Sequence, residues 1–219
     1  HHITGLALVE AQADKNDNFF AYREGFISTE VDEMFAGSDE NKNNGGSASE
    51  GGRMSYVFKL GYGYESRYLI DFVGRVDGSA KFAKNNRWGF FPGVSAAWRI
   101  SEEPFFKNRF KNVDNFKLRL SVGQTGDEAN VNFNYLTGYI FGNSWIFDTG
   151  EAISKGLKSK GLANPNARWA ETTTYNVGID YSIFNRKFYT EVDVFYRLKS
   201  KMLATRAHSL PSTFGASLP

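Results

Sequence analysis

The residues that could catalyse a reaction are few and poorly placed. Glu102-Glu103 and Asp127-Glu128 are neighbouring carboxylates, the residue type that glycosidases use in pairs. Neighbours along a strand point to opposite faces, so neither pair has a recognisable acid/base arrangement. The chain has no cysteine, and two of its three histidines occupy its first two positions. We therefore predict no catalytic residue, no metal site and no bound cofactor.

The composition favours strands over helices. The 219 residues include 22 glycines, 20 phenylalanines and 11 tyrosines but only five prolines, and aromatic side chains suit a pleated surface. The net charge is +2, with basic residues spread among acidic ones, so we expect no nucleic-acid partner. Mean hydropathy is low, at −0.43, but a membrane barrel strand exposes only alternate residues to lipid and is compatible with this value.

Alternation of apolar and polar residues is the strongest pattern in the chain. Between Tyr68 and Val76, the even positions include Ile70 and Phe72, while the odd positions include Asp71 and Arg75. The pattern predicts seven strands, near residues 3–12, 53–64, 68–77, 87–99, 116–123, 175–183 and 190–198. Pro92 lies inside the fourth of these, and since proline cannot donate to a ladder we expect a bulge there.

The predicted links alternate between long and short. Residues 13–52 form a polar loop with a short helix near 28–35, residues 65–67 a tight turn, and 78–86 an intermediate loop. Residues 101–112 resemble a helical connector, the link over 127–170 is long, and the link over 185–186 is short. Outer-membrane barrels have short periplasmic turns and long outer loops, so the order favours a barrel, with 101–112 as an exception. The strand-like stretch 135–147 then falls in an outer loop, where we expect a protruding hairpin.

The fold class expected is therefore all-β, an antiparallel transmembrane β-barrel segment of about seven strands. Alternation alone fits a soluble β-sandwich about equally well, because a sandwich face that meets water gives the same pattern. Tyrosine and tryptophan on the apolar faces, many near strand ends, favour the membrane barrel. The opposite face would line the lumen, and its candidate charged residues are Lys59, Asp71, Arg75, Asp77, Arg87, Arg99, Lys117, Arg119, Asp180, Glu191, Asp193 and Arg197.

Aromatic residues of the 127–170 segment are candidates for substrate contact. Tyr139, Trp145 and Phe147 could stack on the flat apolar faces of sugar rings. A simpler role for these aromatic residues is packing within the loop. Likewise, the simpler role for the charged residues of the lumen is to be solvated or to form ion pairs across strands.

Short motifs stand in a fixed order along the chain. They are Arg67-Tyr68-Leu69, Arg75-Val76-Asp77-Gly78-Ser79, Asn86-Arg87-Trp88-Gly89-Phe90-Phe91-Pro92, Trp98-Arg99-Ile100-Ser101-Glu102-Glu103, Ser121-Val122-Gly123-Gln124-Thr125-Gly126, Asn176-Val177-Gly178-Ile179-Asp180 and Phe195-Tyr196-Arg197. In this order they resemble the SusC/RagA family, over roughly residues 53–203. Each motif alone is weak, and the ordered set is specific.

The resemblance implies a TonB-dependent transporter in the bacterial outer membrane, with a large barrel around an N-terminal plug. It also implies its partners: the lipid bilayer, a SusD-like lipoprotein lid, the TonB complex, and an oligosaccharide or peptide substrate. The family has no catalytic residues. Seven strands are too few for a large barrel, so we expect residues 1–219 to be a partial barrel domain, with the plug and a signal peptide outside this chain.

Two alternatives remain at this point. One is a soluble carbohydrate-binding β-sandwich module, which would be stable without detergent. The other is an enzyme built on an outer-membrane barrel, which would need a nucleophile and a base on one face, and the sequence does not offer such a pair.

Overall fold

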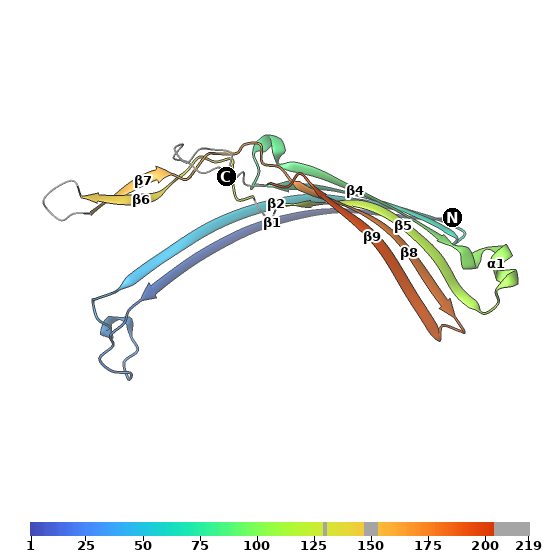
Figure 1. The fold of residues 1–219 in the computed structure, drawn as a ribbon, viewed down its shortest axis with the longest axis horizontal. Helices are drawn as coiled ribbons and strands as arrows, with labels where there is room; N and C mark the ends of the chain where they lie inside the picture. Colours follow the sequence, from blue (N-terminus) through green and yellow to red (C-terminus); the bar gives the residue numbers. More distant parts are fainter. Residues whose placement is uncertain (129–130, 147–152, 204–219) are drawn as a thin grey trace. The chain divides into compact units, whose positions relative to one another are not determined.

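Alternating sequence segments pair edge to edge into one large sheet. The computed structural model describes residues 1–128, 131–146 and 153–203, with the backbone alone at 143–146 and 153–155. Seven strands form the sheet in the order β1 (His2–Tyr22), β2 (Asn43–Tyr64), β3 (Tyr68–Ser79), β4 (Trp88–Arg99), β5 (Val113–Asp127), β8 (Ala170–Ile183) and β9 (Phe188–Ser200) (Figure 1). The all-β prediction is thus confirmed.

Two further strands form a hairpin between β5 and β8. They are β6 (Tyr139–Ile146) and β7 (Ile153–Ser159), which pair antiparallel as a separate two-stranded sheet. The strand-like stretch predicted near 135–147 therefore belongs to the connection, as expected. The helices are short: α1 spans Pro104–Arg109, and 3-10 turns span Met34–Ala36, Lys84–Asn86 and Ile100–Glu102. Among the described residues, no helix is long and apolar enough to cross a membrane.

The strand register places apolar side chains in rows across the sheet. Cross-strand partners share a face, and the register joins Ile70, Ala96, Leu120, Val177 and Val194 in one row from β3 to β9. A parallel row holds Phe72, Val94, Val122, Tyr175 and Tyr196. We call this side of the sheet the apolar face. Most of its large side chains are exposed, Val194 to 69%.

The other side of the same strands carries charge, and we call it the charged face. Its rows join Asp71, Ser95, Ser121, Asn176 and Phe195, and farther along Arg99, Lys117, Asp180 and Glu191. One residue of offset along any strand exchanges the two faces. The alternation in the sequence therefore matches the pairing in the structure strand by strand.

Connections between these strands alternate between two ends of the sheet. Residues 65–67, 100–112 and 184–187 lie at one end, which we call the short-turn end, and the β3–β4 and β5–β8 connections lie at the other, the long-loop end. The turn at Glu65 and Ser66 has positive φ at both residues, with Arg67 N donating to Tyr64 O at 2.9 Å, as tight hairpins require. The tight turn at 65–67 and the helical connector predicted over 101–112 are confirmed.

Three details of the sequence interpretation are wrong. The loop predicted over 13–52 is only 23–42, because β1 continues to Tyr22 and β2 begins at Asn43. No helix forms over 28–35, where only the turn Met34–Ala36 is helical. Pro92 causes no bulge: it pairs with Gly74 without a register shift. The β4–β5 ladder begins at Gly93, so Pro92 lies at its end, where a missing donor is tolerated.

The chain divides into two compact units. One comprises His1–Glu10 and Met54–Pro219, and the other is Ala11–Arg53. In the second unit, Arg23 closes the neck of the 23–42 loop. Its Nη1 donates to the Gly37 carbonyl at 2.9 Å, and its Nη2 lies 3.1 Å from the Asp39 carboxylate. Hydrogen bonding from Lys42 holds the pKa of Asp39 below its usual range.

The buried apolar core is small and lies at the long-loop end. It consists of Phe82, Phe91, Val131, Ala167 and Trp169, all less than a tenth exposed. The ring centroid of Trp169 lies 5.0 Å from that of Phe82 and 5.6 Å from that of Phe91. The Trp169 indole also donates to the Arg87 carbonyl at 3.0 Å. Loops from three parts of the chain are thereby fixed to β4.

Glycine makes room for this core on the charged face. Phe91 lies on that face, opposite Arg75 in the β3–β4 register. A Cβ at Gly89 or Gly126 would overlap the Phe91 ring, so only glycine lets the ring lie flat on the neighbouring backbone.

Candidate functional site

The neighbouring carboxylates are all engaged in structural contacts. Glu102 pairs with Lys107 at 2.6 Å, Asp127 with Lys199 at 3.0 Å, and Glu128 with Lys81 at 3.4 Å. Glu103 accepts hydrogen bonds from the Tyr68 hydroxyl and the Trp98 indole. A general acid or base needs a free oxygen directed at a substrate, and these pairings instead tie loops and strand ends together.

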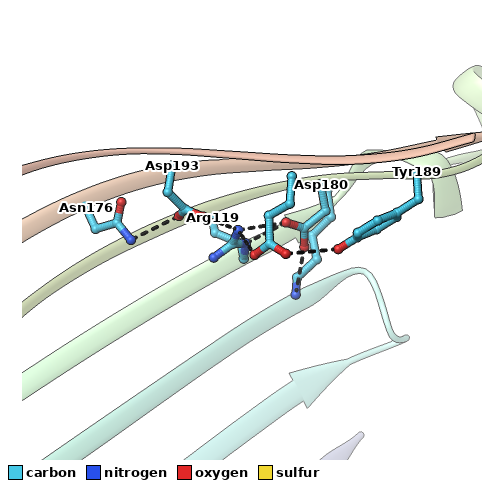
Figure 2. Close-up of polar contacts among 7 residues, drawn as sticks. Arg119, Asn176, Asp180, Tyr189 and Asp193 are labelled. Carbon is cyan, nitrogen blue, oxygen red and sulfur yellow. Dashed lines mark hydrogen bonds and ion pairs between the residues drawn. The ribbon is translucent and has the colours of Figure 1, made fainter.

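Charged residues of β5, β8 and β9 converge on Arg119 (Figure 2). The Arg119 guanidinium lies 2.8 Å from Asp180, 2.6 Å from Glu191 and 2.9 Å from Asp193. Lys117 adds a second cation, 3.6 Å from Asp180. Two further hydrogen bonds reach these carboxylates: Asn176 donates to Asp193 at 3.0 Å, and the Tyr189 hydroxyl donates to Glu191 at 3.1 Å. We call these seven residues the Arg119 network.

Register and one glycine explain why the Arg119 network forms. Arg119 pairs with Gly178, which pairs with Asp193, so the three positions share one row. A Cβ at Gly178 would lie 2.9 Å from Arg119 Cζ and would also meet the Asp193 carboxylate. Because glycine stands there, the arginine side chain crosses the middle strand and reaches β9.

Other predicted lumen residues form separate ion pairs on β1, β2 and β3. Lys59 lies 3.4 Å from Asp71. Arg75 lies 2.7 Å from Asp77 and 3.6 Å from Glu10, and it donates to the buried Ser55 hydroxyl at 3.2 Å. Nine of the twelve predicted charged residues thus form ion pairs with one another, in three separate groups: Lys59 with Asp71, Arg75 with Asp77, and Lys117, Arg119, Asp180, Glu191 and Asp193 in the Arg119 network.

The remaining three are arginines without a carboxylate among the described residues. Arg197 lies with its Cζ 5.5 Å from the Phe195 ring centroid, a cation–π contact. Arg87 and Arg99, near the two ends of β4, each have an Nε atom excluded from solvent with no hydrogen-bond acceptor in the described part of the chain. Buried donors are nearly always paired in folded proteins, so these two atoms need an explanation.

Glu103 forms a separate node at the short-turn end. Its Oε1 accepts hydrogen bonds from the Tyr68 hydroxyl at 2.7 Å and the Trp98 indole at 3.1 Å, and Arg67 lies 3.6 Å from Oε2. The hydrogen bond from Tyr68, followed by that from Trp98, holds the pKa of Glu103 below its ordinary value. The rings of Tyr64, Tyr68 and Trp98 stack in sequence, with centroids 6.4 Å apart at each step.

The predicted loop aromatics lie on or beyond β6. Tyr139 is the first residue of β6, and its side chain is 77% exposed. Trp145 pairs with Ser154 in the β6–β7 register, but its side chain is outside the description. Phe147 lies outside the described residues. A role in substrate contact therefore stays a prediction for all three.

Several residues of these clusters escape sequence reasoning. Ser55, Glu10 and Tyr189 are ordinary strand residues, and only the register reveals that they face Arg75 or Glu191. In the sequence, Glu103 is one of two neighbouring carboxylates, and nothing in that pair predicts its aromatic donors. One signal was available: the motif Trp98–Glu103 places an acidic residue a few positions after a tryptophan at a strand end.

Comparison with solved structures defines the class of fold. The chain is similar to the RagAB peptide importer in its 'closed-closed' and 'open-open' states, with a TM-score of 0.81 for each and identities of 24% and 25%. The match covers 98% of this chain and 23% of the importer chain. The fold is that of part of a TonB-dependent transmembrane β-barrel.

Comparison of sequences defines the family. The TonB-dependent receptor SusC of Bacteroides thetaiotaomicron is 33% identical over 167 residues, which is 75% of this chain and 16% of the receptor. A TonB-dependent receptor of Formosa agariphila is 34% identical over 150 residues, 68% of this chain and 14% of the receptor. No family model matches the chain. The chain belongs to the SusC/RagA family of TonB-dependent receptors, and spans about one sixth of the relatives' length.

Proposed function

We propose that this chain forms part of the wall of an outer-membrane transporter that imports oligosaccharides or peptides, driven by TonB. The apolar face would meet lipid, and the charged face would line the lumen and contact the plug. The observation that carries the proposal is the exposed apolar face, which runs in register across five strands. Soluble monomers rarely expose so continuous an apolar surface, whereas a barrel wall requires one.

The spacing of aromatic residues supports a membrane-spanning wall. Trp88 and Trp98 lie on the apolar face near the two ends of β4. Ten residues of strand rise by about 33 Å, and a tilt of about 40° reduces this to about 25 Å, the height of the apolar band in outer-membrane barrels. Trp88 stacks on Tyr56 and Trp98 on Tyr68. In the proposed wall, these rows would form the interfacial aromatic belts at the two boundaries of the bilayer.

The two ends of the sheet support an orientation. Barrels of this class have short turns in the periplasm and long loops outside. The turns 65–67 and 184–187 would then be periplasmic, and the connection that contains β6 and β7 would be external. On this orientation the exposed Tyr139 would face arriving substrate or a lipoprotein lid.

The relatives support transport rather than catalysis. They are named receptors, and the similar structures are those of a peptide importer. A SusD-like lipoprotein and the TonB complex would be partners of the whole receptor, whose N-terminal plug would fill the barrel. We propose them for this protein on family membership, and we leave the choice between oligosaccharide and peptide to experiment.

Fractionation of the native host tests the proposal. An antibody against residues 23–42 should detect a band in the outer membrane that is several times longer than 219 residues. The band should migrate faster before boiling than after boiling, as a folded barrel does. A small band in the soluble fraction, unaffected by heat, would contradict the proposal and favour the carbohydrate-binding sandwich. A soluble protein of the same host, probed on the same gel, controls for contamination of the membrane fraction.

A further inference from the structure

The connection over residues 100–112 is the exception at the short-turn end. It is longer than the turns 65–67 and 184–187, and it contains α1. Proline is favoured in the first turn of a helix, which fits the start of α1 at Pro104. A helix of six residues is not stable alone, so contacts with the sheet must hold it.

Glu103 holds the start of the 100–112 connection against the apolar face. Its carboxylate accepts hydrogen bonds from the Tyr68 hydroxyl and the Trp98 indole. Tyr68 and Trp98 are cross-strand partners whose stacked rings belong to the apolar face, in line with Ile70 and Ala96. The chain therefore leaves β4 toward the apolar side of the sheet.

Phe106 holds the helix against the same face. Its ring centroid lies 4.8 Å from that of Phe110 and 5.7 Å from that of Phe116 on β5. Phe116 lies two positions before Leu118, the β5 partner of Trp98, so its ring also belongs to the apolar face. The 100–112 connection thus folds over the side of the sheet that would meet lipid on the proposed function.

Acidic side chains at this end of the sheet have partners within the protein. The acidic residues of its connections and of the start of β5 are Glu65, Glu102, Glu103 and Asp114. Glu65 lies 3.2 Å from Arg67, and Glu102 lies 2.6 Å from Lys107. Asp114 accepts the Arg186 backbone N–H at 2.9 Å, and Glu103 accepts the two hydrogen bonds already described. None of these carboxylates compensates the side chains of Arg109 and Lys111, which are exposed.

The turn 184–187 lies beside the 100–112 connection and adds to its positive charge. The Phe184 N–H donates to the Asn112 carbonyl at 3.2 Å. The side chains of Arg186 and Lys187 are exposed and form no ion pair within the described part of the chain. Together with Arg109 and Lys111, they make four cations that no described carboxylate compensates.

Exposed phenylalanines accompany these cations. Phe105 is 62% exposed, Phe110 48% and Phe184 56%. Cations beside apolar rings are typical of segments that lie on a lipid surface, where the cations bind phosphate groups and the rings enter the boundary with the acyl chains. The neighbouring rings of Tyr68 and Trp98 would mark the same boundary. Phospholipid phosphate therefore fits this surface better than an acidic protein, which would have to displace lipid from the rings.

We propose that the 100–112 connection and the 184–187 turn bind the phosphate groups of phospholipids at the periplasmic surface of the outer membrane. The four uncompensated cations bind phosphate oxygens, and the rings of Phe105 and Phe110 lie beneath the headgroups. The inference rests on the proposed function, since it requires the apolar face to meet lipid and the short-turn end to be periplasmic. It gives a reason for the length of this connection, which folds back onto the wall.

Spin labelling of the full-length receptor measures where the connection lies. The chain has no cysteine, so Phe105→Cys can be the single cysteine of a receptor cleared of any others. In nanodiscs of phosphatidylethanolamine and phosphatidylglycerol, a nitroxide at position 105 should collide more often with oxygen, which concentrates in lipid, than with a water-soluble nickel complex. Phe72→Cys, in the middle of the apolar face, is the control for lipid. Ser28→Cys, exposed in the 23–42 loop, is the control for water.

These labels separate the phosphate surface from the proposed function. If the Phe72→Cys label behaves like the Ser28→Cys label, the apolar face lies in water and the proposed function fails. If the Phe72→Cys label lies in lipid but the Phe105→Cys label collides mainly with the nickel complex, only the phosphate surface fails. Protection of the Phe105→Cys label from both reagents would indicate a protein contact, and it would also overturn the proposal.

Removal of the cations tests whether they bind phosphate. In neutral detergent, added phosphatidylglycerol should raise the heat-shift temperature of the parent receptor by about 5 °C, because a ligand of the folded state stabilises it. Diacylglycerol, which lacks phosphate, should not. Most of the rise should be lost in a fourfold variant that carries Arg109→Gln, Lys111→Gln, Arg186→Gln and Lys187→Gln. The matched control removes four exposed cations of the long-loop connections and should keep the rise, with Lys84→Gln, Lys158→Gln, Lys160→Gln and Arg168→Gln.

Three results of the lipid titration would overturn the proposal. They are no rise in the parent, an equal rise with diacylglycerol, and a parental rise in the fourfold variant. Should the fourfold variant fail to assemble, Arg186→Gln with Lys187→Gln leaves the 100–112 connection intact. This double variant should give a rise smaller than that of the parent, and a parental rise would again contradict the role of the cations.

Discussion

At the scale of single residues, Arg119 is the charge on which three carboxylates depend. Replacing it with methionine keeps much of its packing but leaves Asp180, Glu191 and Asp193 without their shared cation. Removing one partner from a part-buried ion network costs about 1–3 kcal/mol. We expect Arg119→Met to lower the free energy of unfolding of the full receptor by that amount, measured by urea titration of its heat-shift band.

A second substitution and a control make the Arg119 result specific. Adding Asp193→Asn removes one of the stranded charges, so the double variant should recover part of the lost stability. Arg197→Met removes an arginine from the same face that contacts the Phe195 ring and no described carboxylate, and it should cost less. Equal losses at positions 119 and 197 would show that the ion network contributes nothing particular.

Glu103 should make stability depend on pH. Its pKa is lowered in the folded state, first by the Tyr68 hydroxyl and then by the Trp98 indole. The unfolded chain therefore binds the proton more tightly, so the stabilisation is complete above the ordinary glutamate pKa of about 4.3 and is lost as pH falls through the folded pKa. We expect Glu103→Gln to lower the heat-shift temperature by a few degrees at pH 7, and the difference from the parent to shrink as pH falls below the ordinary glutamate range.

The neighbouring residue provides the control for Glu103. Glu102→Gln removes a carboxylate that contacts only the exposed Lys107 among the described residues, and exposed pairs contribute little. A pH profile of Glu103→Gln that runs parallel to that of the parent would contradict the role assigned to the Tyr68 and Trp98 hydrogen bonds.

At the scale of elements, β3 tests which face meets lipid. Phe72 lies in the middle of the apolar face, opposite Val94, and Val73 lies opposite Gly93 on the charged face. An arginine near the bilayer midplane costs about 2–4 kcal/mol. Phe72→Arg should therefore reduce the amount of heat-shifting receptor in the outer membrane, whereas Val73→Arg should be tolerated. Equal tolerance at the two positions would reject this assignment of faces.

The small core at the long-loop end should hold its loops as one unit. Phe91→Ala removes the ring that covers Gly89 and Gly126 and contacts Trp169, and truncation of a buried phenylalanine costs about 3–5 kcal/mol. We expect faster hydrogen exchange in residues 80–87 and 160–169. Exchange in the turns 65–67 and 184–187 at the opposite end should stay unchanged, and a uniform increase would mean that the loss is global.

Sequence reasoning succeeded where one face of a strand differs from the other. Alternation located β3, β4, β5, β8 and β9 because their faces differ in polarity. It ended β1 near residue 12 and began β2 near 53, whereas pairing continues to Tyr22 and from Asn43. In those extensions residues 14–18 and 43–52 are almost all polar or glycine on both faces, so backbone pairing leaves no periodic trace there.

The clusters of the charged face were only half predictable, for a related reason. Alternation assigns Arg119 and Asp193 to one face, but their contact depends on register and on the absence of a side chain at Gly178. Register is set by pairing between strands, and paired residues can be far apart in the sequence: Arg119 and Asp180 are separated by 61 positions. No pattern within one strand encodes it.

At the scale of the whole molecule, the exposed apolar face and the sheet edges together limit what this chain can do alone. β1 and β9 are the outer strands of the sheet, and each has one edge that no described strand pairs. In lipid such edges must be paired, and in water an open apolar face with free edges promotes aggregation. On the proposed function, the sheet would be part of a wall that further strands continue.

Expression of residues 1–219 by themselves puts this argument to the test. We expect the isolated chain to aggregate in detergent-free buffer and to show strand content by circular dichroism only in detergent micelles, without the cooperative heat shift of the full receptor. A charged variant of the apolar face, Ile70→Lys with Val177→Lys, should reduce aggregation, because it interrupts the row that joins these residues through Ala96 and Leu120. The same changes placed at Asp71 and Asn176 on the charged face should not. A monodisperse, cooperatively melting monomer without detergent would mean that the apolar face is covered within the chain, as in a sandwich, and the membrane assignment would then fail at its main support.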